Sequence, residues 1–142
     1  YAKLLEKYPY DAEGQNNFLT LVSEESPREA LLELDKLAQD NPKYGAIYAQ
    51  KAMIYIKMNQ DMLAIDNLYK ALQLEPQNNN YKYNLAVLFD KNGYYENAAL
   101  LYDDLIEQSR RGIPIPVNKT TLTDRMTYIK AKIKASDEKK PL

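Results

Sequence analysis

A spacing of 34 residues recurs along this chain and limits its fold more than any other feature. Pro42 and Pro76 are separated by this step. A fixed period of this length is typical of stacked copies of one small helical unit, and such stacks usually present a binding surface rather than a catalytic pocket. Three groups of similar side chains keep the same step, namely Ala30, Ala64 and Ala98; Asn16, Gln50 and Asn84; and Leu34, Leu68 and Tyr102.

Caps, prolines and apolar periodicity divide the chain into helices. Ser26-Pro27 with Glu29 has the pattern of an N-cap, a proline at the first helical position and a capping box. Gly93 is suited to the left-handed backbone at a helix end. Apolar residues at three-to-four spacing between such signals predict helices over 12–23, 27–40, 44–58, 61–74, 79–91, 95–109 and 120–135.

These helices form pairs, and we expect one domain over residues 1–142. The expected parts are the end of a preceding helix at 1–9, repeats at 11–44, 45–78 and 79–112, an extended strap at 113–119, a capping helix at 120–135 and a polar tail at 136–142. The strap is predicted to be extended because Pro114 and Pro116 are incompatible with a helix interior. Since the first residues read as the middle of a helix, we expect the chain to be a fragment of a longer protein.

The repeats resemble the tetratricopeptide repeat (TPR) family, most clearly between residues 45 and 76. There the chain matches the family's alternation of large, small and closing residues at Tyr48, Ala52, Tyr55, Ala64, Ala71 and Pro76. The alanines allow close approach of helix backbones, and the tyrosines fill the spaces between pairs. The resemblance implies an all-α fold, an α-solenoid of stacked helix-turn-helix units that ends in a C-terminal capping helix.

The resemblance also implies a binding site. In TPR proteins the first helices of successive pairs line a concave groove that binds peptides or helices. Amide side chains along this groove suit the backbone of an extended peptide, since they both donate and accept hydrogen bonds. Carried over by register, the candidate groove residues are Asn16, Leu19, Gln50, Met53, Lys57, Tyr83, Asn84, Val87 and Lys91, and the same register adds Asp90.

Composition argues against catalysis. The chain contains neither cysteine nor histidine, which removes thiolate metal ligands and the side chain that most often transfers protons near neutral pH. Asp103 and Asp104 are adjacent, and adjacent helical residues point apart. The four glycines of the chain are scattered along the sequence, so they do not form a phosphate-binding loop. We expect no catalytic residue, no metal and no cofactor, and we predict that these residues are not an enzyme.

Charge is unevenly distributed. Residues 1–109 carry 10 basic and 17 acidic side chains, whereas residues 110–142 carry 9 basic and 3 acidic ones. The basic end is interpreted as the solvated face of a capping helix rather than a nucleic-acid site, because aromatic residues are scarce there. No apolar run is long enough to insert into a membrane.

The leading hypothesis is a non-enzymatic adaptor or scaffold module that binds a peptide or helix of another protein in its concave groove. The alternative is a structural module. It would either assemble into a homo-oligomer or pack within a larger bacterial protein, and that larger protein could be anchored in a membrane. An enzymatic role would require a catalytic domain outside these residues. For location, the cytoplasm is favoured over the periplasm or a membrane-anchored chain.

Overall fold

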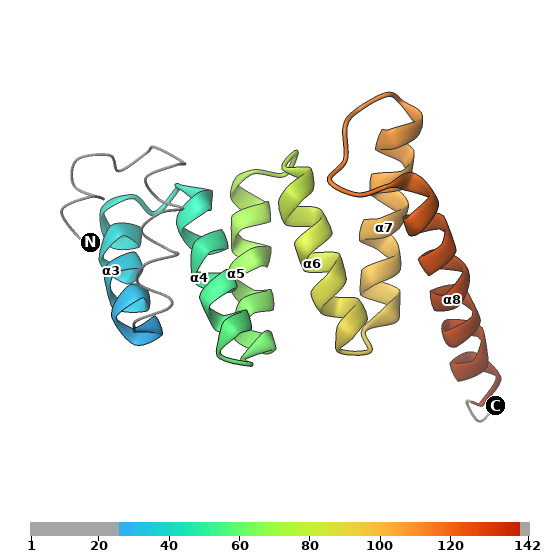
Figure 1. Cartoon of the computed structure of the whole chain (residues 1–142), viewed down its shortest axis with the longest axis horizontal. Coiled ribbons are helices and arrows are strands. Elements are labelled where there is room, and N and C mark those ends of the chain that lie inside the picture. The colour runs from blue at the N-terminus through green and yellow to red at the C-terminus, as the bar shows by residue number, and fades with distance from the viewer. Residues whose placement is uncertain (1–25, 140–142) are drawn as a thin grey trace. The chain divides into compact units, whose positions relative to one another are not determined.

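Local signals set the helix boundaries in the computed structural model, which describes residues 26–139. Within that range the chain is all-α, as predicted, with no strand. Asn16 and Leu19, and the helix predicted at 12–23, lie outside the described residues. The helices are α3 (Pro27–Asp40), α4 (Gly45–Lys57), α5 (Asp61–Leu74), α6 (Asn79–Lys91), α7 (Tyr95–Arg110) and α8 (Lys119–Glu138) (Figure 1).

Side-chain caps and residues with positive φ fix where several helices begin and end. Ser26 accepts a hydrogen bond from the backbone N–H of Glu29 at 3.3 Å, as the capping pattern predicts. Asn78 caps α6 through Tyr81 N–H at 3.1 Å, and Asn118 caps α8 through an N–H at 2.8 Å. Gly93, with φ of 84°, ends α6 in the left-handed region that glycine adopts without strain.

Two compact units divide the chain, residues 1–74 and 75–142. In the first unit α4 packs on both α3 and α5. Apolar spacing predicts an inward face of α4 made of Tyr48, Ala52, Tyr55 and Ile56; the first two are buried and the last two are partly buried. This prediction missed Ile47 and Ile54, which are also buried and form a core with Ala30 and Leu34 of α3. A helix packed on two sides needs two apolar faces, and a single stripe describes only one of them.

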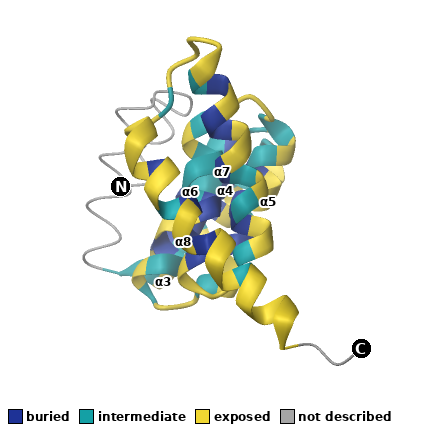
Figure 2. Cartoon of the chain, turned by 90° about the vertical axis from the view of Figure 1, so that its right-hand side faces the viewer, coloured by how far each residue is buried: buried dark blue, intermediate teal, exposed yellow. Residues whose placement is uncertain are grey.

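In the second unit α7 packs on α6 and on α8. Leu122, Met126 and Ile129 of α8 are buried against the α6–α7 core, and exposed residues line the outer side of α8 (Figure 2). This arrangement fits the expected cap, since a terminal helix of a repeat array needs one apolar and one polar side. The strap is tied down as well: Asn79 Nδ2 donates to the Pro114 carbonyl at 3.1 Å, and Ile115 and Val117 pack against the core.

The end of the last helix differs most from its predicted position. The polar tail was expected from residue 136, but α8 continues to Glu138. Ala135, Ser136, Asp137 and Glu138 include neither glycine nor proline, so nothing local interrupts the helix. The expectation of a single domain over 1–142 stays a prediction.

Candidate interaction surface

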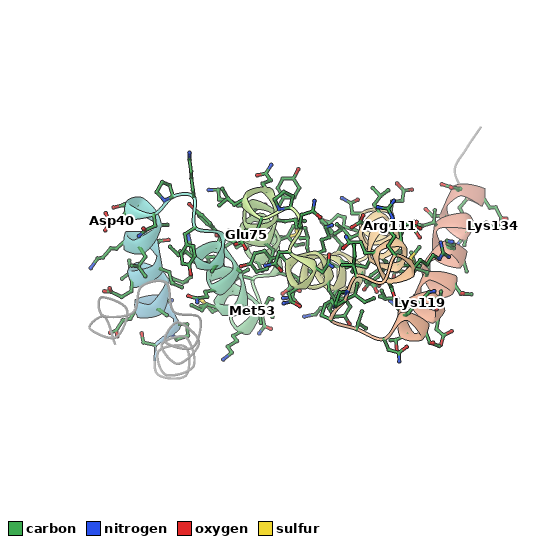
Figure 3. All side chains as sticks on the ribbon, turned by 90° about the horizontal axis from the view of Figure 1, so that it is seen from above. Asp40, Met53, Glu75, Arg111, Lys119 and Lys134 are labelled. Atoms are coloured by element: carbon green, nitrogen blue, oxygen red, sulfur yellow. The ribbon has the colours of Figure 1, made fainter. Side chains whose placement is uncertain are left out.

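On α4, two of the three candidate groove residues are exposed. Met53, which is labelled in Figure 3, is 40% exposed. Lys57 is exposed one turn further on. Gln50 is only 8% exposed. The spacing of four residues places Met53 and Lys57 on one face of the helix, and we call this pair the α4 stripe. Burial of Gln50 leaves little of its amide accessible to a ligand, so the expected ladder of accessible amides does not extend to this position.

On α6, the candidate residues are more accessible. Val87 is 38% exposed, Lys91 is exposed, and Tyr83 and Asn84 are half-buried. Val87 and Lys91 are also four residues apart, and we call this pair the α6 stripe. Each stripe consists of an exposed apolar residue followed one turn later by a lysine, and the two stripes are separated by the 34-residue period.

Asp90 was expected on the groove, but it lies in a buried cluster on α6. It is 8% exposed and pairs with Arg125 of α8 through both carboxylate oxygens, with Arg125 Nε donating to Oδ2 at 2.7 Å. The Tyr102 hydroxyl of α7 donates to Oδ2 at 3.1 Å. Asp90 therefore joins three helices of the second unit and is not available to a ligand. The sequence feature that could have revealed this pairing is an acidic residue on a helix face that is otherwise buried, because a buried carboxylate needs a partner.

Two members of the cluster, Tyr102 and Arg125, have shifted pKa values. Burial, reinforced by the adjacent Asp90 charge and hydrogen bond, raises the pKa of Tyr102. The hydrogen bonds to Asp90 raise the pKa of Arg125 further above its already high value. The Arg125 guanidinium also lies 4.2 Å from the ring centroid of Tyr128, which is within cation–π range. The cluster favours a neutral Tyr102 and a protonated Arg125, which suits structural rather than proton-transfer chemistry.

Asp104, the carboxylate in the adjacent acidic pair, is also engaged in structure. Lys82 Nζ contacts Asp104 Oδ2 at 2.6 Å, and Gln108 Nε2 donates to the same oxygen at 2.7 Å. Partial burial raises the pKa of Asp104, but these hydrogen bonds outweigh it and lower the pKa overall. Asp104 is thus held as a carboxylate that links α6 to α7.

Among residues 26–139, no group of three metal-ligating side chains gathers. None of the helices α3 to α8 combines the length and apolar character that crossing a bilayer requires.

The fold has clear counterparts among solved structures. It is similar to one crystal structure of MamA with a TM-score of 0.59 and 16% identity, covering 96% of this chain and 86% of that one. A second crystal structure of MamA gives a TM-score of 0.59 and 18% identity, with coverage of 97% and 82%. At these identities the likeness concerns the fold, an α-solenoid of helical repeats. No protein-family model and no curated protein matches the sequence.

Proposed function

We propose that this protein is a non-enzymatic interaction module that binds a peptide or helix of a partner protein, with the α4 stripe and the α6 stripe each acting as a contact surface of its own unit. The TPR resemblance supports the proposal, because the first helix of each pair lines the binding groove in that family. The helical-repeat fold is consistent with such a role, since these folds commonly present extended binding surfaces.

One observation carries the proposal. Met53 and Val87 are 40% and 38% exposed at equivalent positions of α4 and α6, and each is followed by an exposed lysine. Burial of apolar side chains in a complex lowers the free energy, because apolar surface is removed from water. Lysines can pair with acidic groups or donate to the carbonyls of a bound chain. Each such pair suits a ligand segment that is acidic and partly apolar.

The experiment compares two surface substitutions of the same chemistry. The variant Met53→Asp/Val87→Asp changes both stripes, while Leu100→Asp changes an exposed leucine on α7 that lies in neither. Partners recovered with the wild-type protein from its source organism are identified, and their affinities for the purified variants are measured by calorimetry. We expect the stripe variant to bind at least about tenfold more weakly and Leu100→Asp to bind as the wild type does.

Helical circular dichroism and melting temperature serve as the folding control, because both substitutions are at exposed positions and should leave the fold intact. Unchanged affinity of the folded stripe variant would contradict the assignment of α4 and α6. Light scattering of the free protein in the same series tests the alternative role in self-assembly, which predicts association that grows with concentration.

A further inference from the structure

Helix α5 exposes three large apolar side chains. Met62, Leu63 and Tyr69 are 55%, 43% and 54% exposed. Met62, Asp66 and Tyr69 are spaced by four and three residues, so they lie along one face of the helix, with Leu63 beside them. This face, defined by Met62, Leu63, Asp66 and Tyr69, is separate from the α4 and α6 stripes.

The 34-residue period provides an internal comparison for this face. The positions of Met62, Leu63 and Tyr69 are occupied by exposed polar residues in both equivalent helices, Arg28, Glu29 and Asp35 in α3, and Glu96, Asn97 and Asp103 in α7. Polar residues at these positions are therefore compatible with the repeat, and folding alone does not require apolar ones. Grouped exposed apolar side chains are a common mark of an interaction site.

Charge indicates what kind of partner fits. Asp66 is exposed midway between Met62 and Tyr69, at the position that Leu32 and Leu100 occupy in α3 and α7. The nearby Lys70 ammonium lies 4.9 Å from the ring centroid of Tyr48 on α4. Two copies of α5 packed antiparallel about a twofold axis would place one Asp66 carboxylate against the other, and like charges in contact are unfavourable. A basic partner residue would instead pair with Asp66.

We propose that this face of α5 binds one amphipathic helix of a partner protein. Apolar residues of that helix would pack against Met62, Leu63 and Tyr69, and a lysine or arginine would pair with Asp66. Helix-on-helix recognition of this kind uses anchors at three- and four-residue spacing, which is the spacing that α5 presents. This second surface would allow the module to hold two partners at once.

The test uses a pair of designed peptides. Both are fluorescein-labelled amphipathic helices of about 15 residues with leucines on one face. One has a lysine at the centre of that face and the other a glutamate. We expect the lysine peptide to bind the wild-type protein about three- to tenfold more tightly than the glutamate peptide, measured by fluorescence anisotropy.

Two protein variants locate the binding. Met62→Glu/Leu63→Asn/Tyr69→Asp copies onto α5 the residues found at the same register in α7, and it should lose binding of both peptides. Asp66→Lys keeps the apolar residues and should reverse the preference toward the glutamate peptide. Circular dichroism establishes that each variant is folded, and Asp66→Lys alone tests the proposal if the triple variant is not.

Two results with the wild-type protein would overturn the proposal: no binding of either peptide up to about 1 mM, or equal binding of both peptides. Two results with the variants would do the same: an unchanged peptide preference in Asp66→Lys, or undiminished binding by the folded triple variant. A wild-type dimer that the triple variant abolishes would overturn it too, because the occupant would then be a second copy.

Discussion

Individual side chains divide into those that hold the helices together and those left at the surface. Asp90, Tyr102 and Arg125 belong to the first group, because their hydrogen bonds join α6, α7 and α8. Met53 and Val87 belong to the second, as their exposure shows. The same kind of division separates Gln50, which is buried, from Asn84, which is only partly buried, although both occupy the same register.

Removing the guanidinium of Arg125 should destabilise the second unit. Asp90 is nearly buried, so Arg125→Ala would leave a carboxylate without its bidentate partner and should lower the free energy of unfolding by about 1.5–3 kcal/mol. The matched variant Arg110→Ala breaks an exposed pair with Glu107, worth about 0–1 kcal/mol. Urea denaturation measures both, and equal losses would contradict the structural role of the cluster.

Tyr102 should make the protein sensitive to alkaline pH. Its pKa is raised in the folded state, so the unfolded chain releases the hydroxyl proton first, near the usual tyrosine pKa of about 10. The stabilisation from the neutral hydroxyl is present below about pH 10 and is lost progressively as the pH rises above it. Tyr102→Phe should be less stable at pH 8 but show a shallower decline above pH 10, as measured by urea denaturation across pH. Parallel declines in both proteins would exclude Tyr102 as the source.

Residue-level roles were the hardest part to predict from sequence. The register placed Gln50 and Asp90 with the groove residues because it records position along a repeat, not contacts with neighbouring helices. Asp90 is paired by Arg125, 35 residues away, and only the packing of α8 on the second unit brings the two together. Met53 and Val87 are exposed, as contact with a ligand requires, and their place in a groove stays a prediction.

At the level of helices, α8 closes the core of the second unit. Ile129 is fully buried against α6 and α7, whereas Ile133, one turn further on, is only partly buried. We expect Ile129→Ala to lower the free energy of unfolding by about 2–4 kcal/mol and Ile133→Ala to cost clearly less. Denaturation of the two variants by urea provides the comparison. If Ile133→Ala cost as much or more, the apolar side of α8 would be wrongly assigned.

Helix positions were largely predictable because their signals are local. Ser26-Pro27, Asn78 and Gly93 act within a few residues of where they occur, and α3 and α6 have the predicted bounds. The C-terminal end of α8 was missed because Ser136 and Asp137 were interpreted as a polar tail, although polar residues continue a helix when no breaker follows. The second apolar face of α4, which contains Ile47 and Ile54, was missed because its apolar residues were interpreted as a single stripe. In the structure α3 and α5 pack on two sides of this helix, so two faces are buried.

Over the whole molecule, helices of one repeating design carry different surfaces. The stripes of α4 and α6 repeat with the 34-residue period, whereas the apolar face of α5 departs from it. The repeated feature supports the same kind of ligand contact on each unit, and the exception supports a separate partner. Both depend on helices that leave these side chains exposed.

Site-specific photo-crosslinking tests the central claim most directly. A benzophenone amino acid is placed at Met53, at Val87 or, as the control, at Leu100, and the protein is irradiated inside its source organism. We expect the Met53 and Val87 positions to crosslink to the same partner protein and the Leu100 position not to. Crosslinks to that partner from Leu100 alone, or none from either stripe, would contradict it.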